Sequence, residues 1–266
     1  MLDEVLQDLE AESAALDRLV SGLSPQEWSH PTLAPGWTVA HQIAHLHWTD
    51  EVATLANADP DRFYARLAES MDDPLTYVDR AAAAGVAPPD ELLPRWRAGR
   101  RALIDALKAV PNNEKRPWFG TAMSPVSSAT GRMMETWAHG RDIADTFPDQ
   151  SREYAQPTAR LRHVAFIGYR TIGHGFESHG RPAPTEPFRV ELIMPDREQL
   201  AFGPEAAGNR VTGPILDFCL LVTQRRHPAD LALQASGDEA NAWLTVAQAF
   251  AGPPGEKREP KAARNR

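Results

Sequence analysis

The chain has 266 residues, of which 42% are hydrophobic, and this length is enough to bury one large core or two modest ones. Its formal net charge of −8, with no basic patch interleaved with aromatic residues, argues against a nucleic-acid partner. The single cysteine cannot form an internal disulfide. The N-terminus lacks the features of a signal peptide, and no stretch reaches the length of a membrane span. We therefore expect a cytoplasmic protein without a membrane partner.

The first predicted element is an amphipathic helix that begins near Leu2 and ends near Gly22. Its apolar residues recur at steps of three, four and seven along the chain, as expected for one face of a helix. A Pro-rich connection follows, and Trp37 and Thr38 begin a second helix. We expect one stripe of this second helix to face the core, namely positions 41, 45, 48, 52 and 55.

The middle of the chain is predicted to contain a crossover and two more helices. Acidic and Pro-containing segments interrupt the helical patterns of residues 57–88, so we expect a long crossover with partial helix there. A third long helix is predicted from about Asp90 to Val110, with most of its arginines on a solvated face. A loop rich in Pro, Gly and Ser then precedes the helix that carries Glu135 and His139, and another helix is predicted at 158–179.

The composition changes abruptly at residues 180–187, where three prolines indicate a stiff, extended linker. We therefore predict a helical domain at 1–182, a small α+β domain at 183–252 and a mobile tail at 253–266, which has few apolar residues to bury. The hydrophobic patterns of the second domain predict strands at 188–195, 200–203 and 231–236 and helices at 214–226 and 239–251.

Two of the predicted helices carry metal-ligand residue types at helical spacing. His41 and His45 are four residues apart, as are Glu135 and His139, and Asp142 extends the second face by another turn. Two such helices placed face to face can supply the three imidazole and carboxylate ligands of a catalytic-type metal site. The spacing leaves an alternative open: the histidines are hydrogen-bonded core residues, and the acid–histidine pair only supports its helix.

The stretches GWTVAHQIAHL and METWAHGRDIAD, followed by a C-terminal pattern that runs from FRVEL to WL, resemble a known family. They are similar to the DinB/YfiT-like metal-dependent proteins, within the actinobacterial group that includes mycothiol-dependent maleylpyruvate isomerase. The resemblance covers about residues 5–252. It implies a mainly α protein, with an N-terminal four-helix bundle followed by a small, sterol-carrier-like α+β domain. It also implies that His45, Glu135 and His139 are the metal ligands.

Two neutral imidazoles and one carboxylate leave at least one position on a divalent metal open to water or substrate. With these mixed ligands zinc is the first expectation, and nickel, iron and manganese remain open. The resemblance implies an enzyme that uses a mycothiol-type thiol in the transfer or isomerisation of an electrophilic small molecule. The alternative is a metal-binding protein of the same fold without thiol-transfer activity, because fold does not fix function.

Further residues near these motifs have expected roles of their own. The resemblance implies that an arginine of the second domain is catalytic; this position falls on Arg225, and its neighbour Arg226 leaves the choice open. We expect His41 to support a ligand or to line the pocket; the alternative is a fourth ligand, which would close the site and favour a structural role. Asp142 is expected either to orient His139 or to take part in ordinary helix packing.

Overall fold

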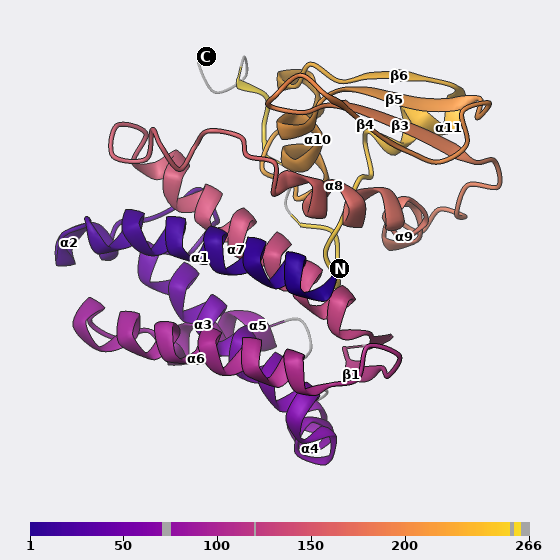
Figure 1. The fold of residues 1–266 in the computed structure, drawn as a ribbon. Helices are drawn as coiled ribbons and strands as arrows, with labels where there is room; N and C mark the ends of the chain where they lie inside the picture. Colours follow the sequence, from indigo (N-terminus) through magenta and orange to yellow (C-terminus); the bar gives the residue numbers. More distant parts are fainter. Residues whose placement is uncertain (71–75, 120, 256–257, 262–266) are drawn as a thin grey trace. The chain divides into compact units, whose positions relative to one another are not determined.

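The computed structural model describes residues 1–70, 76–119, 121–255 and 258–261 (Figure 1). The chain forms two compact units: residues 1–156, here called the helical unit, and residues 157–266, here called the mixed unit. The protein is mainly helical, and its four-stranded mixed sheet lies in the mixed unit. Over the described ranges, no helix combines the length and apolar character needed to cross a membrane.

Four long helices form the framework of the helical unit, as far as it is described: α1 (Leu2–Ser21), α3 (Val39–Ala58), α6 (Pro89–Ala109) and α7 (Pro125–Thr146). Helix α3 packs against both α6 and α7, and α7 also packs against α1 (Figure 1). Their apolar stripes meet in a buried core that includes Leu16, Trp28, Ile43, Leu92 and Trp96. The long helices predicted at the N-terminus, after Thr38 and near residues 90–110 are thus confirmed.

Shorter elements connect the long helices: α2 (Pro25–Trp28), α4 (Pro60–Ser70), α5 (Tyr77–Gly85), β1 (Arg116–Trp118) and β2 (Thr121–Met123). Helices α4 and α5 account for the partial helix predicted in the crossover, of which residues 71–75 lie outside the described part. The β1–β2 hairpin was not predicted, since each strand has only three residues. Phe63 of α4 stacks on Trp118 of β1, which links the crossover to the hairpin.

Arg95 and Arg101 of α6 are exposed as predicted, but an ion-pair network between α1 and α6 corrects the prediction of a solvated face for Arg97 and Arg100. Asp17 accepts hydrogen bonds from Arg97 Nε at 2.8 Å and from Arg100 Nη2 at 2.6 Å. Burial acts to raise the pKa of Asp17, but hydrogen bonds from Arg97, Ser21 and Arg100 outweigh it and lower the pKa to about 2. The two arginines therefore join helices, because Asp17 faces α6 from a partly buried position on α1.

The mixed unit contains a sheet and several short helices: α8 (Leu161–Arg170), α9 (Ile172–Ser178), β3 (Phe188–Ile193), β4 (Gln199–Phe202), β5 (Asn209–Pro214), α10 (Ile215–Val222), η1 (Pro228–Asp230), β6 (Gln234–Ser236) and α11 (Asp238–Trp243). The strand order is β4-β3-β5-β6. Strands β3 and β5 are parallel, with Val190 opposite Val211, and the other neighbours are antiparallel. Buried Phe218 of α10 lies close to the Trp243 ring.

Three predictions for the mixed unit are wrong in detail. Strand β5 was missed, because it is a parallel neighbour of β3 and its pairing depends on residues far away in the sequence. The helix predicted at 158–179 is broken at Thr171, where α8 ends and α9 begins. The helix predicted at 239–251 ends early, since α11 reaches only Trp243.

The boundary between the two units differs from the predicted domain boundary after residue 182. Helix α8 belongs to the mixed unit because it packs closely on α10: a Cβ added at Gly168 would lie 2.8 Å from atoms of both Phe218 and Val222. Cys219 is buried and donates its thiol proton to the Leu161 carbonyl at 3.5 Å. The division into independent folding domains at 1–182 and 183–252 stays a prediction.

The predicted mobile tail lies partly outside the described residues. Its described part contacts the mixed unit: the Gly255 N–H donates to Gln224 Oε1 at 3.1 Å, and the Lys261 N–H donates to the Asp230 carboxylate at 3.1 Å. These hydrogen bonds tie the described tail residues to the segment that follows α10.

Candidate metal centre

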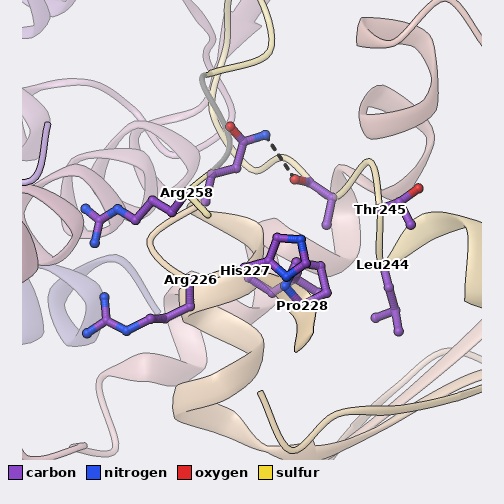
Figure 2. A pocket seen from close by; sticks show the side chains of 9 residues that line it. Arg226, His227, Pro228, Leu244, Thr245 and Arg258 are labelled. Carbon is purple, nitrogen blue, oxygen red and sulfur yellow. Dashed lines mark hydrogen bonds between the residues drawn. The ribbon is translucent and has the colours of Figure 1, made fainter. Parts of the chain in front are cut away.

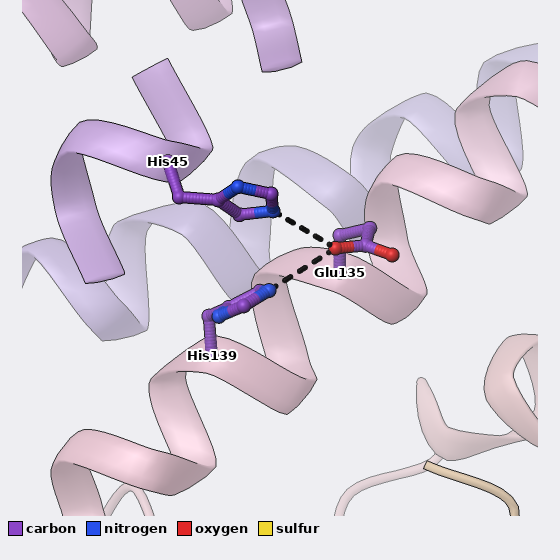
Figure 3. Close-up of side chains that lie close together, drawn as sticks. All are labelled: His45, Glu135 and His139. Atoms are coloured by element: carbon purple, nitrogen blue, oxygen red, sulfur yellow. Dashed lines mark hydrogen bonds and ion pairs between the residues drawn. The ribbon is translucent and has the colours of Figure 1, made fainter. Parts of the chain in front are cut away.

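Three side chains of metal-ligand type converge between α3 and α7 (Figure 3). His45 comes from α3, and Glu135 and His139 lie one turn apart on α7. Each helix begins at a hydrogen-bonded cap, with the side chains of Thr38 and Ser124 accepting backbone N–H bonds at the N-termini of α3 and α7. The caps fix where each helix begins, and therefore which residues of each helix face the other.

The distances match those expected of a preformed ligand set. Glu135 Oε2 lies 3.4 Å from His45 Nε2 and 3.2 Å from His139 Nε2, and one ligand atom from each residue lies within 4.8 Å of the others. Zinc binds nitrogen and oxygen at about 2.0–2.2 Å, so tetrahedral ligand atoms are roughly 3.3–3.6 Å apart. The arrangement therefore fits a divalent ion and leaves a fourth position for another ligand.

Electrostatics keep His45 and Glu135 in the protonation states that metal binding requires. Burial and the neighbouring His139 lower the pKa of His45 to about 4, which keeps its imidazole neutral at physiological pH. Burial acts to raise the pKa of Glu135, but hydrogen bonds with His139 and His45 outweigh it, so this pKa lies well below its usual value. Two neutral imidazoles and one carboxylate are the forms that bind a cation.

Trp37 forms an aromatic wall beside the three ligands. Its ring stacks on the His139 ring at 5.7 Å and lies 5.2 Å from the His45 ring. The indole N–H of Trp37 donates to Asp79 at the start of α5, at 2.9 Å. This hydrogen bond holds the indole plane against the imidazoles, so Trp37 shapes one side of the space next to the ligands.

Gln42 contacts the ligand set from the same helix as His45. Its Oε1 lies 2.5 Å from His139 Nδ1, and its side chain is completely buried. Sequence reasoning missed this residue; for Asp142, which is buried on α7, it left open an orienting role or ordinary helix packing. The available signal was its position three residues before His45, because this spacing places a side chain on the same side of a helix.

A buried ion pair joins α3 and α7 next to the candidate ligands. Arg132 Nε donates to Asp50 Oδ1 at 3.0 Å, and Arg132 Nη2 donates to Thr49 Oγ1 at 2.6 Å. The Thr49 hydroxyl donates in turn to the His45 carbonyl at 2.8 Å. Because Arg132 lies one turn before Glu135, this pair fixes the register of the two ligand-bearing helices.

His41 lies outside the group of candidate ligands, and its expected role beside the metal stays a prediction. Its Nδ1 accepts the backbone N–H of Thr38 at 3.3 Å and lies 2.8 Å from the Thr38 hydroxyl. The ring therefore completes a capping box at the start of α3. Its ring lies 6.4 Å from the ring of Trp37, which in turn lies next to both candidate ligand imidazoles.

Arg225 and Arg226 follow α10 in the mixed unit. Arg225 Nη1 donates to the Thr223 carbonyl at 2.7 Å, and the Arg225 carbonyl accepts from Arg226 Nη1 at 2.7 Å and Arg258 Nη1 at 2.9 Å. Arg226 and Arg258 line a small pocket that they share with His227 (Figure 2). The catalytic role assigned to Arg225 stays a prediction.

Comparison with known proteins adds independent findings. Uncharacterized proteins Rv0036c and MT0041, from two strains of Mycobacterium tuberculosis, are each 48% identical to this chain over 252 residues. Each alignment covers 94% of this chain and 96% of the relative. The crystal structure of the mycothiol-dependent maleylpyruvate isomerase matches with a TM-score of 0.57 at 19% identity, over 89% of this chain and 93% of the other. A mutant of that isomerase matches with the same TM-score at 18% identity.

These structural matches show a shared fold, and the family is established by sequence. A model of the mycothiol maleylpyruvate isomerase N-terminal domain matches residues 9–144, which contain all three candidate ligands. The predicted relationship to the DinB/YfiT-like proteins is thereby confirmed. The chain belongs to the family defined by the mycothiol maleylpyruvate isomerase N-terminal domain.

Proposed function

We propose that this protein binds one divalent metal ion through His45, Glu135 and His139, and that it is an enzyme acting on an electrophilic small molecule with a mycothiol-type thiol. The observation that carries the proposal is the convergence of three ligand atoms within 4.8 Å of one another, from two helices. A structural site usually closes four protein ligands around zinc, whereas three protein ligands leave a position for chemistry.

Charge supports a thiol as the incoming group. A divalent ion held by one carboxylate and two neutral imidazoles keeps a net charge of about +1, which favours binding of an anion. Such an ion would lower the pKa of a thiol at the open position, so that the nucleophilic thiolate forms at physiological pH. Zinc suits these ligands best, and nickel, iron and manganese are the other candidates.

The protein's own side chains would position the reactants. Trp37 offers an apolar face beside His139, which excludes water from one side of the centre. We assign to Arg225 the recognition of a substrate carboxylate, because a guanidinium binds carboxylate through two parallel hydrogen bonds. Its neighbour Arg226 is the alternative. We also assign a sterol-carrier-like fold to the mixed unit and a DinB-like four-helix bundle to the helical unit.

A metal-binding protein without thiol transfer is the second candidate. The family match covers residues 9–144, which lie within the helical unit, and does not extend to the mixed unit. The ligand-bearing half can therefore be shared by proteins whose second units differ. In that case the metal would serve a different nucleophile or a binding function.

Elemental analysis and a thiol-transfer assay separate the candidates. We expect one equivalent of metal in the purified protein and its loss in the His45→Ala, Glu135→Ala and His139→Ala variants, all of which should remain folded. Mycothiol with maleylpyruvate is the first substrate pair to test. Stoichiometric metal in the triple-alanine variant would rule out the ligand assignment, and metal without turnover of any electrophile would favour the second candidate.

A further inference from the structure

A chain of hydrogen bonds leads from His139 to a backbone carbonyl through two polar side chains. His139 Nδ1 lies 2.5 Å from Gln42 Oε1, and Gln42 Nε2 donates to Thr32 Oγ1 at 2.9 Å. Thr32 Oγ1 donates to the Trp37 carbonyl at 2.9 Å. The chain therefore connects a candidate metal ligand to the loop that precedes α3.

The direction of these hydrogen bonds follows from the chemistry of the last acceptor. A carbonyl oxygen can only accept, so the Thr32 hydroxyl donates its one proton to the Trp37 carbonyl and must accept a hydrogen bond from Gln42. Gln42 then presents its amide nitrogen to Thr32 and its oxygen to His139. An amide oxygen can only accept, so His139 Nδ1 carries a proton and its Nε2 is the ring nitrogen that faces Glu135.

We propose that Gln42 and Thr32 are positioning residues of the metal centre, which keep a proton on His139 Nδ1 and turn its Nε2 toward the metal position. This inference rests on the proposed metal site and is independent of thiol chemistry. Metal-bound imidazoles usually donate their second N–H to a neighbouring acceptor, which orients the ring. A neutral amide in that place leaves the net charge of the centre unchanged, whereas a carboxylate would lower it by one.

His45 provides an internal contrast. Its Nδ1 is buried and has no hydrogen-bond partner among the described residues. The two imidazoles are thus held differently, with the ring of His139 anchored and that of His45 positioned by packing against Trp37 and Trp48. We therefore expect a protonated Nδ1 for His139 in the metal-free protein, and we expect Gln42 substitutions to change His139 and leave His45 unchanged.

The first measurement is nitrogen-15 NMR of the histidine rings in metal-free protein, with the His139→Ala variant used to assign the signals. The expected result is a protonated Nδ1 of His139 in the wild type and in Gln42→Glu, which keeps the accepting oxygen. Gln42→Leu should lose this preference. Thr32→Val should weaken the preference for a proton on Nδ1, because the Gln42 amide loses its acceptor, whereas Thr32→Ser keeps the hydroxyl and should retain the preference.

The second measurement is zinc affinity, by competition with a chelator. Loss of a group that orients a ligand typically lowers metal affinity about 10–100-fold, and this is the range expected for Gln42→Leu. Gln42→Glu and Thr32→Ser should bind within a few-fold of the wild type. Gln248→Leu is a matched control, because Gln248 is a buried amide in the mixed unit that donates to backbone carbonyls. It should lower stability and leave zinc affinity unchanged.

Several outcomes would overturn the inference. One is an Nε2–H tautomer for His139 in the wild type, and another is wild-type zinc affinity in Gln42→Leu. If Gln42→Leu does not fold, Thr32→Val decides the question, since Thr32 lies outside α3 and an unchanged tautomer there would also refute the role. If the wild type binds no metal, the proposed function fails, and the tautomer of metal-free His139 still tests the positioning role separately.

Discussion

Replacing Arg132 with methionine should strongly destabilise the helical unit. The side chains of Arg132 and Asp50 are only 4% and 6% exposed, so the substitution leaves a buried carboxylate without its counter-charge. Removal of one partner from a buried ion pair costs about 3–5 kcal/mol. For a unit of this size, 1 kcal/mol shifts the Tm by roughly 2–4 °C, so a fall of roughly 6–20 °C is expected.

The assay is urea unfolding of metal-free protein followed by far-ultraviolet circular dichroism, in Arg132→Met alone and together with Asp50→Asn. The double variant should recover much of the loss, because the remaining partner no longer carries a buried charge. Burial raises the pKa of Asp50 even beside Arg132. A carboxyl whose folded-state pKa is raised destabilises the fold fully above that pKa and no longer does so below its unfolded-state pKa of 3.8, so the loss in Arg132→Met should shrink as the pH is lowered. A loss below about 1 kcal/mol, or no recovery in the double variant, would refute this reasoning.

Other expectations concern single side chains. Asp17→Asn should lower the free energy of unfolding by about 2 kcal/mol at neutral pH, because the pKa of Asp17 is about 2 in the folded state against 3.8 in the unfolded state. This stabilisation is complete above pH 3.8, so the difference from the wild type should vanish as the pH falls toward 2. A difference that does not depend on pH would contradict this. His41→Ala should keep the metal and lose roughly 1 kcal/mol of stability through its capping box, whereas metal loss as complete as in a ligand variant would make His41 a ligand. Arg225→Ala and Arg226→Ala should both keep the metal, and one should lose most turnover; normal turnover in both would remove arginine from the mechanism. Burial raises the pKa of Cys219 well above its usual value, so the folded protein should resist thiol reagents, and rapid labelling would show that the site opens.

The helices and candidate ligands could be predicted because their signals are local. Residues close together in the sequence form the apolar stripe of α1, and Glu135 and His139 are four residues apart. In a helix, residues at such spacing lie on the same face. The family motifs then selected His45 over His41. The same reasoning failed for β5, because a strand that pairs in parallel with β3 takes its partner from a distant part of the chain.

The sequence by itself determined the helical framework, the family and the residue types available to hold a metal. Only the tertiary structure decided which groups meet. It placed His45 of α3 within 3.4 Å of Glu135 on α7, brought Gln42 against His139, and turned Arg97 toward Asp17. The physical reason is that contacts between helices depend on their relative rotation and register. Many buried side chains set these together, and no short stretch of sequence contains them.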